Sequence, residues 1–475
     1  MTSMKKNILL LFCCVALSQF AFTQHRIPLS QLDEFENPSK NWILVSDLSI
    51  DLHKSNLKLV NGKGVLVNQP VKGSTNLVSK THIEGDSEIS FEFMTSKQSQ
   101  SAIYIYGRYK ILLTDSWSNP RVSQNDLGAL EVNPIDNSTF NSIPPYSKVE
   151  KAPGLWQHMR IKFRTPEFDN SGIKTKNARY EEVYLNGVLV HQDIAVTAPS
   201  NGSLFDDESK SGPLVFMADE DHAIAFRNIN YRSLAPSKKA TVPENRWAAM
   251  EFFRPTSPIL LNPEKDPYLL RSYLVSDNKK YTHVISVGNP NQTNFSYDLK
   301  QGSILQFWRG QFVDVTEMWV ARGEPQLAKP LGVVTALSST PTLAVLNDID
   351  VAWPDSIDFD TFKSKGYSLD INKNPTFHYE YSGFSVDDKI SMDREGEALN
   401  REINVWNAPP GLHVKLASAK LIESMGKGLY AIDGKSYYIK IDQRLKPIIR
   451  KSQHSEELLI QLTKSTSSLE YSIIF

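Results

Sequence analysis

The stretch from Trp156 to Arg164 alternates apolar and polar side chains, and this alternation limits how the surrounding chain can fold. Its apolar odd positions are Met159, Ile161 and Phe163, and the even positions between them are polar or charged. A period of two predicts a β-strand with one buried and one exposed face, because successive strand side chains point to opposite sides. A helix would need apolar residues at a period of 3.6.

A second strand pair follows in the chain. Residues 180–185 and 188–190 are β-like and meet across Asn186-Gly187. This dipeptide tolerates positive φ at both central positions of a two-residue hairpin turn, so an antiparallel sheet is predicted. The loop from Thr165 to Asn177 lacks an apolar period and is expected on the surface.

From Leu29 to Leu234, short β-like runs alternate with turn clusters and show no helical period. Strands at this spacing predict an all-β sandwich. The interval from Asp115 to Pro153 is rich in Asn, Ser and Pro and is too long for a simple hairpin loop. Long insertions of this kind often form the rim of a binding site.

At 475 residues the chain is long enough for two or three domains. Lys5 and Lys6 precede an apolar run and small residues follow, which predicts a secretory signal peptide over residues 1–23. Residues 235–243 have the composition of a linker. We therefore expect a first domain over 24–234 and a second β-rich domain over 244–475, exported to the periplasm or cell surface.

The composition excludes several classes of function. Both cysteines, Cys13 and Cys14, lie in the expected signal peptide, so a mature chain would have no disulfide, thiolate metal site or cysteine nucleophile. The net charge of −1 gives no electrostatic reason to expect nucleic acid as a partner. The apolar run is too short to span a bilayer. The sequence does not indicate an oligomeric state.

The first domain resembles the secreted bacterial family of 3-keto-disaccharide hydrolases, which have a concanavalin-like jelly-roll fold. The resemblance is carried by short motifs spread in order over residues 42–234. They are Asn76-Leu77-Val78-Ser79, Gly107-Arg108-Tyr109, Asp115-Ser116, Asp126-Leu127-Gly128-Ala129, Pro153-Gly154-Leu155-Trp156, Asn177-Ala178-Arg179, Asn186-Gly187-Val188-Leu189-Val190-His191, Gly212-Pro213-Leu214 and Phe226-Arg227-Asn228-Ile229.

The resemblance implies a glycoside or oligosaccharide substrate and chemistry that can be stated physically. A ketone at C3 of a sugar acidifies the hydrogen on C2, so a base can form an enolate that expels the group at C1. Such a site needs a base near C2 and a cation or hydrogen-bond donors at the enolate oxygen, commonly a divalent metal. Family members are expected to supply a Glu and a Gln after the Gly-Arg-Tyr motif, and a Gln, Asp and His after Gly-Pro-Leu.

This sequence departs from that pattern. Lys110 stands at the expected Glu, Leu112 at the first Gln and Met217 at the second. An extra residue leaves the expected His either replaced by Glu220 or shifted to His222. Whether a divalent metal is still bound therefore stays open.

The candidate catalytic residues are Arg108, Asp115, Asp219 and His222. The candidate substrate-binding residues are Tyr104, Tyr106, Lys110 and Trp117. If one strand carries residues 104–110, its even positions share the concave face, where tyrosines could form a platform for sugar rings. The alternative is ordinary sheet packing of these tyrosines.

We further consider that Lys110 pairs with Glu220 or Asp219, which would replace a metal-binding cluster by an internal ion pair. The alternative is that Lys110 and Glu220 are unrelated surface charges.

The second half resembles a β-rich module of exported bacterial quinoproteins and c-type cytochrome proteins of sugar oxidation. Within it, Trp308, Arg309 and Asp314 could line a ligand pocket, or form a buried Trp with a structural Arg–Asp pair.

Two functions follow for the whole chain. The first is an exported glycosidase or lyase that acts on 3-keto-glycosides. The second is a non-catalytic carbohydrate-binding or scaffold protein that retains the fold but has a degenerate site.

Overall fold

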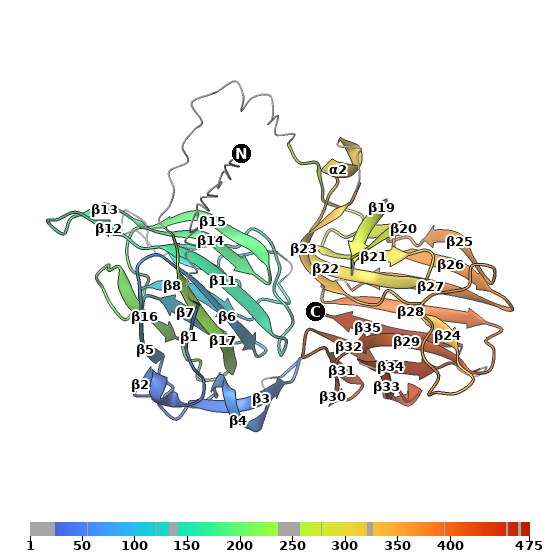
Figure 1. Ribbon diagram of the computed structural model, residues 1–475, viewed down its shortest axis with the longest axis horizontal. Coiled ribbons are helices and arrows are strands. Elements are labelled where there is room, and N and C mark those ends of the chain that lie inside the picture. Colours follow the sequence, from blue (N-terminus) through green and yellow to red (C-terminus); the bar gives the residue numbers. More distant parts are fainter. Residues whose placement is uncertain are drawn as a thin grey trace, which may run out of the picture.

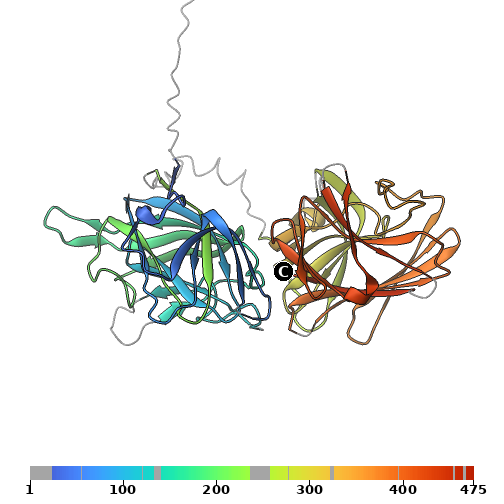
Figure 2. The same ribbon diagram turned by 90° about the horizontal axis from the view of Figure 1, so that it is seen from below.

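The protein consists of two β-rich halves that pack side by side (Figures 1 and 2). The computed structural model describes residues 24–54, 56–119, 121–132, 141–235, 257–276, 278–320, 326–393, 395–452, 455–463 and 467–475. The expected signal peptide at 1–23 and most of the expected linker, 236–243, lie outside these residues. None of the helices in the described ranges is long and apolar enough to cross a membrane.

The first half is a sandwich of two antiparallel sheets. The larger sheet has the strand order β15-β14-β11-β6-β17-β4-β3, and β1 also pairs with β17. Its strands are β1 (His25–Arg26), β3 (Trp42–Ile50), β4 (Leu57–Asn68), β6 (Ser87–Thr95), β11 (Gln157–Arg164), β14 (Ala178–Leu185), β15 (Val188–Val196) and β17 (Ile224–Ser233).

The second sheet of this half has the order β10-β9-β8-β7-β16-β5-β2. Its strands are β2 (Phe35–Glu36), β5 (Leu77–Glu84), β7 (Gln100–Ile105), β8 (Tyr109–Thr114), β9 (Leu130–Val132), β10 (Asn141–Ile143) and β16 (Ser211–Phe216). A short 3-10 helix, η1 (Leu32–Glu34), precedes β2, and the ribbon of β12 (Glu167–Phe168) and β13 (Lys174–Lys176) projects from the sandwich (Figure 1).

The alternation in β11 is confirmed. Met159, Ile161 and Phe163 are fully buried between the sheets, because their parity places them on the inner face. The predicted hairpin joins β14 to β15, where Asn186 has φ 53° and Gly187 has φ 85°. One apolar cluster fills the space between the sheets and includes side chains from β5, β6, β7, β8, β11, β14, β16 and β17.

The second half is also all β, as predicted. Its sheets contain six, four and eight strands, and one large apolar cluster connects them. The six-stranded sheet comprises β18 (Leu260–Leu261), β19 (Tyr268–Ser276), β20 (Lys279–Gly288), β21 (Thr293–Asp298), β22 (Ser303–Asp314) and β23 (Lys329–Ala336). The four-stranded sheet comprises β24 (Leu343–Val345), β29 (Leu412–Ala419), β33 (Ile448–Ser452) and β34 (Ser455–Gln461).

The eight-stranded sheet runs in the order β25-β26-β27-β28-β35-β32-β31-β30. Its strands are β25 (Phe362–Leu369), β26 (Pro375–Tyr381), β27 (Phe384–Met392), β28 (Ala398–Trp406), β30 (Ile422–Gly426), β31 (Leu429–Ile432), β32 (Tyr437–Ile441) and β35 (Ser468–Ile474). Among its described residues this half also has two short helices, α2 (Thr316–Trp319) and η2 (Gln443–Leu445).

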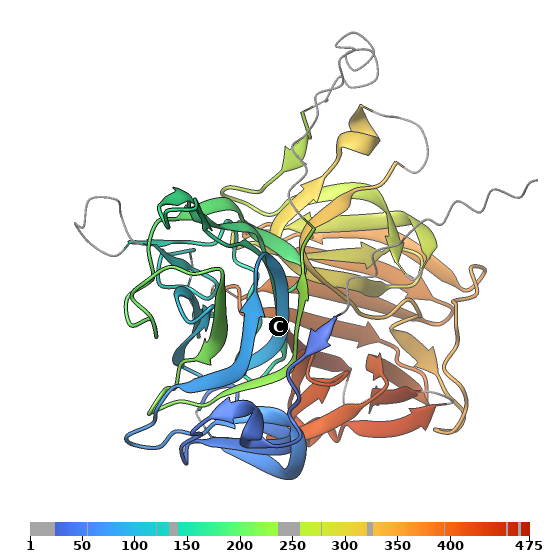
Figure 3. The same ribbon diagram turned by 60° about the vertical axis from the view of Figure 1, so that its left-hand side comes forward.

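A buried seam joins the halves, and Figure 3 shows their sheets in close apposition. The Trp117 indole donates to the Phe475 carbonyl at 2.7 Å, and Arg309 donates to the Trp117 carbonyl at 2.9 Å. Lys435 forms ion pairs with Asp47 at 2.9 Å and Glu423 at 3.2 Å. An apolar cluster crosses the seam and comprises Leu52, Trp117, Ala152, Leu155, Ala398, Ala431, Tyr438 and Ile474.

The contacts in the seam distinguish the two interpretations of Trp308, Arg309 and Asp314, a ligand pocket or a buried Trp with an Arg–Asp pair. Trp308 is buried, as the second reading expected. The expected Arg–Asp pair is wrong, because Arg309 reaches across to Trp117 and lies 3.9 Å from Glu150, whereas Asp314 accepts from Thr316. Arg309 therefore belongs to the junction between the halves.

Gly154 lies where the seam is tightest. Its φ is +78°, and a Cβ atom here would come within 2.5 Å of the Tyr438 hydroxyl and 2.7 Å of the Ile50 carbonyl oxygen. We expect Gly154→Ala to lower the free energy of unfolding by about 2 to 4 kcal/mol, because backbone strain adds to overpacking. Urea denaturation of the full chain would measure the change.

Gly187→Ala is the matched control, since Gly187 also has positive φ but a Cβ there would meet nothing within 4 Å. Its free energy of unfolding should fall by about 1 kcal/mol, from backbone strain alone. Equal losses in the two variants would contradict the tight contact at the seam.

His191 gives a pH prediction. Burial lowers its pKa to about 4, although its bond with the Gly128 carbonyl acts in the opposite direction. Protonation below pH 6.5 therefore favours the unfolded chain, and stability falls as the pH drops from 6.5 to about 4. Replacing His191 by Gln should remove at most about 3 kcal/mol of this loss.

Stability curves at several pH values, compared between the wild type and His191→Gln, would check this. The exposed His53 supplies the control His53→Gln. If the difference in free energy of unfolding between the wild type and His191→Gln stays constant from pH 7 to pH 4, the imidazole is not buried in its neutral form.

Candidate functional site

A cavity of about 680 Å³ lies on the outer face of the second sheet of the first half. Ile111 and Leu113 of β8 point into the sandwich core, so the alternate side chains of β8 face this cavity. The loops before β7, after β8 and between β16 and β17 complete its wall. The lining residues are Gln98, Ser99, Gln100, Ser101, Lys110, Leu112, Thr114, Asp115, Asn125, Met217 and His222.

The cavity brings together the positions at which this sequence departs from the family pattern. Lys110 and Leu112 come from β8, and Met217 and His222 come from the loop between β16 and β17. Glu220 instead accepts a hydrogen bond from the Gly73 backbone at 3.1 Å and does not line the cavity. Of the two readings of the expected histidine, the geometry favours the shift to His222.

His222 is held by Asp219. Its Nδ1 lies 3.2 Å from Asp219 Oδ2, and Asp219 Oδ1 accepts from the backbone N–H groups of Asp221 and His222. Gln100 N–H donates to Oδ2 at 2.7 Å. An ionised carboxylate only accepts, so this arrangement favours a proton on Nδ1 and leaves Nε2 as a proton acceptor.

The loop that carries this pair is fixed by the strands around it. Asn68 of β4 donates to the carbonyls of Asp219 and His222 at 2.8 and 3.3 Å. Ser101 Oγ donates to the Met217 carbonyl, and Asn76 accepts from Ala218 N–H. The histidine is thus held in one position before any ligand arrives.

Lys110 supplies a positive charge to the cavity. Its Nζ lies 3.0 Å from Glu131 Oε2, and the other Glu131 oxygen accepts from Asn201 N–H at 2.9 Å. The proposed pairing of Lys110 with Glu220 or Asp219 is therefore wrong. β9 places Glu131 beside β8, whereas Asp219 is already engaged with backbone donors.

Asp115 borders the cavity, but its carboxylate is largely engaged. Oδ2 accepts from Gln98 N–H at 2.8 Å and lies 3.6 Å from Lys97 Nζ, and Oδ1 accepts from Trp117 N–H at 3.3 Å. Only 3% of its side chain is exposed. Asp115 therefore orders the wall between the cavity and the domain seam.

Arg108 does not line the cavity. The strand predicted over 104–110 is interrupted, because β7 ends at Ile105 and a turn follows in which Tyr106 has φ 55°. Arg108 donates to the backbone and side chain of Asp207, both at 2.6 Å, and also to two further carbonyls. Its guanidinium cross-links this turn to the segment before β16.

The predicted aromatic platform is not exposed. The Tyr106 hydroxyl bonds Ser87 and Gly85 inside the sandwich, and Tyr104 is 3% exposed, with its hydroxyl on the Asn201 carbonyl. Burial raises the pKa of Tyr104. Trp117, the last of the candidates, lies in the seam with its indole on the second half.

Of the eight candidates, the cavity therefore includes Lys110, Asp115 and His222, with Asp219 behind the histidine. Sequence motifs do not mark the other polar lining residues. Gln98, Gln100, Ser101, Thr114 and Asn125 have no motif of their own. A polar run just before β7 was the available signal, but such runs are also typical of turns.

The cavity does not suit a divalent metal. In the described part of the chain, no group of three or more His, Cys, Asp or Glu side chains could hold one. The ammonium of Lys110 would repel a cation, and Leu112 and Met217 offer no oxygen donor. The residues present therefore do not fit the metal that the family resemblance left open.

Replacing Lys110, Leu112 and Met217 by the residues expected in the family should create a metal-binding site. The triple variant Lys110→Glu, Leu112→Gln, Met217→Gln would put three oxygen-bearing side chains on the wall that already holds His222. We expect saturable binding of Mn²⁺ or Ca²⁺ by the variant in calorimetry and no saturable binding by the wild type.

A matched control is Lys63→Glu, which makes the same change of charge at an exposed position of β4 outside the cavity. If the triple variant binds no more metal than this control, the four positions do not form one coordination site.

One family model matches part of the chain. Residues 31–232 match the family model described as the 3-keto-alpha-glucoside-1,2-lyase-like domain. No curated protein matches the chain.

Several solved structures are similar to parts of the chain. A putative glycosyl hydrolase from Parabacteroides distasonis ATCC 8503 is 18% identical, with a TM-score of 0.31 over 44% of this chain and 84% of its own. A second one from the same organism is 19% identical, with a TM-score of 0.29 over 45% of this chain and 100% of its own.

The botulinum neurotoxin serotype D ligand binding domain, solved with N-acetylneuraminic acid, is 12% identical over 94% of this chain and 95% of its own, with a TM-score of 0.24. TM-scores this low do not define a shared fold, so the assignment rests on the family model. Residues 31–232 of the first half thus match the family of 3-keto-alpha-glucoside-1,2-lyase-like domains.

Proposed function

We propose that the first half cleaves 3-keto-glycosides by elimination, with His222 as the base and Lys110 as the cation at the enolate oxygen. The observation that carries the proposal is that His222, held by Asp219, lines the same cavity as the Lys110 ammonium. The cavity volume of about 680 Å³ suits a disaccharide. Ligand pockets commonly span about 300 to 1,000 Å³.

The residues would act in sequence on the bound sugar. Nε2 of His222 takes the proton from C2, and the electron pair of that bond forms an enolate with the C3 oxygen. Lys110 has three N–H donors, so it can stabilise this oxygen while it still pairs with Glu131. The enolate then reforms the C3 ketone, makes a C1–C2 double bond and expels the oxygen at C1, which takes the proton back from the imidazolium.

The cavity walls support binding of the sugar hydroxyls. Gln98, Gln100 and Ser101, before and at the start of β7, and Asn125 in the loop after β8, present amide and hydroxyl groups. Polar groups fixed by the backbone around them orient a substrate with little loss of entropy.

A non-catalytic carbohydrate-binding protein is the second candidate. The loss of three oxygen-bearing side chains at positions 110, 112 and 217 favours it, because Leu112 and Met217 make that wall less polar. In this case the same cavity would hold a saccharide without cleaving its bond.

We also propose export of the protein, on the basis of the signal-peptide pattern over residues 1–23. Fractionation of a bacterial host that expresses the full-length chain would test this. Recovery of the uncleaved chain from the cytoplasm would contradict it.

A 3-keto-glucoside with a chromogenic leaving group would test the reaction. We expect turnover by the wild type that is unchanged by a chelator, since the cavity lacks a metal-ligand set. His222→Gln should lower kcat by about 10²- to 10⁴-fold, the usual contribution of a general base.

His158→Gln is the control, because His158 is exposed on the other sheet of the sandwich and does not line the cavity. If the wild type turns nothing over, calorimetry with the same glycoside distinguishes the candidates: binding supports the carbohydrate-binding protein, and no binding overturns both.

A further inference from the structure

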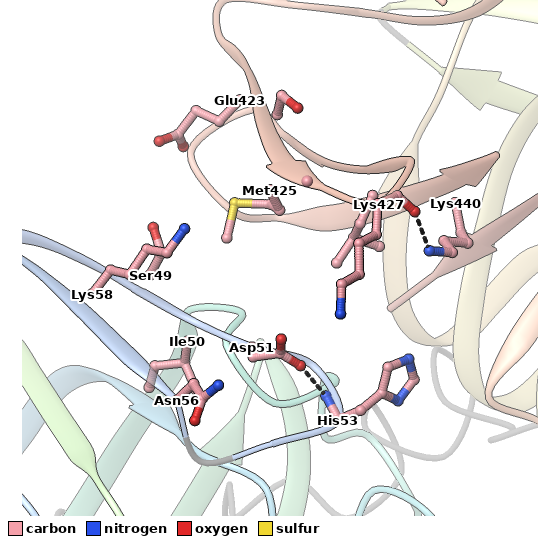
Figure 4. A pocket seen from close by; sticks show the side chains of 13 residues that line it. Ser49, Ile50, Asp51, His53, Asn56, Lys58, Glu423, Met425, Lys427 and Lys440 are labelled. Atoms are coloured by element: carbon pink, nitrogen blue, oxygen red, sulfur yellow. Dashed lines mark hydrogen bonds between the residues drawn. The ribbon is translucent and has the colours of Figure 1, made fainter. Parts of the chain in front are cut away.

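A second cavity lies in the seam between the two halves and shares no residue with the cavity around His222. Its volume is about 430 Å³. One wall is formed by the end of β3, the following loop and the start of β4, and the opposite wall by β30, β31 and β32 (Figure 4). The lining residues are Ser49, Ile50, Asp51, His53, Asn56, Lys58, Glu423, Ser424, Met425, Gly426, Lys427, Leu429 and Lys440.

The walls are held in place by contacts deeper in the seam. Lys435, with 4% of its side chain exposed, forms ion pairs with Asp47 of β3 and Glu423 of β30. The Tyr438 hydroxyl donates to the Pro153 carbonyl at 3.3 Å, and the Trp156 amide donates to the Lys435 carbonyl at 3.2 Å. These contacts fix the spacing of the two halves, so the cavity is preformed.

The cavity carries an excess of positive charge. Lys58, Lys427 and Lys440 line it, and within the described residues none of their ammonium groups forms an ion pair with a carboxylate. Lys440 donates only to the Lys427 carbonyl, at 2.5 Å. Of the two acidic lining residues, Glu423 shares Lys435 with Asp47, so the three lysines are opposed by Asp51 and by part of the charge of Glu423.

The side chains point in directions that suit one ligand. Lys427 extends from its hairpin toward the opposite wall, where Asp51 and His53 lie, and Met425 lies between the two walls (Figure 4). Lys58 on one wall and Lys427 and Lys440 on the other repel one another less when an anion enters between the walls. Met425 and Leu429, from β30 and β31, add an apolar strip that a ring can cover.

We propose that the seam cavity binds a small saccharide that carries an anionic group, a carboxylate or a sulfate ester. Lys58 and Lys427 bind the anion, the apolar strip packs against the ring, and Ser49, Asn56 and Ser424 bind its hydroxyl groups. Because the walls come from both halves, the bound saccharide also bridges them.

Calorimetry on the full chain tests this with four probes: a galacturonic acid disaccharide, a sulfated disaccharide, a neutral galactose disaccharide and inorganic sulfate. We expect one or both acidic disaccharides to bind at least tenfold more tightly than the neutral one, and binding to weaken at high salt. The tighter of the two acidic disaccharides identifies the anion.

The variant Lys58→Gln, Lys427→Gln should weaken binding of the acidic disaccharide by at least about tenfold, the effect of losing a charge-assisted hydrogen bond. The control Lys363→Gln, Lys451→Gln removes two exposed lysines that do not line the cavity and should leave affinity within about twofold.

Circular dichroism establishes that both variants are folded. Unchanged affinity in Lys58→Gln, Lys427→Gln, equal binding of the neutral disaccharide, or no binding of either acidic disaccharide would overturn the proposal. Inorganic sulfate that binds as tightly as the sulfated disaccharide would overturn the role of the ring.

Discussion

The buried contacts of Trp117 and Glu150 with the second half are the constraint on which the rest of the structure depends. The Trp117 carbonyl accepts from Arg309 and from Lys148, and the Trp117 indole donates to Phe475. Burial and the nearby Arg309 lower the pKa of Lys148 to about 8. Charged groups this deeply buried are costly when a partner is removed, so the two halves act as one packed unit at this point.

The same segment links the seam to the cavity of the first half. Asp115 lies on the cavity wall and accepts from the Trp117 backbone, while Trp117 is fixed by the second half. The long insertion that the sequence placed between Asp115 and Pro153 therefore forms both a cavity rim and a domain contact. The order of the cavity wall depends on a domain that contributes no residue to it.

The exchange at position 110 changes the electrostatics of the cavity. An expected Glu would bind a metal, which then stabilises the enolate, whereas Lys110 brings its own positive charge and pairs with Glu131. A lysine needs no loading with metal, but its ammonium stabilises an oxyanion less strongly than a divalent ion does. The His222–Asp219 pair places an imidazole at the cavity, which is consistent with the proposed elimination.

The sequence by itself determined the all-β class, the buried face of β11 and the turn at Asn186-Gly187, because side-chain parity and turn conformation are local properties of the chain. It also located positions 110, 112 and 217, since short motifs mark them, but it left the expected histidine open between positions 220 and 222. Only the tertiary structure decided that β7 ends at Ile105, that Glu131 faces Lys110, and that Trp117 docks on the second half. These depend on which distant segments meet, and a local pattern reports the face of a residue but not its partner across the fold.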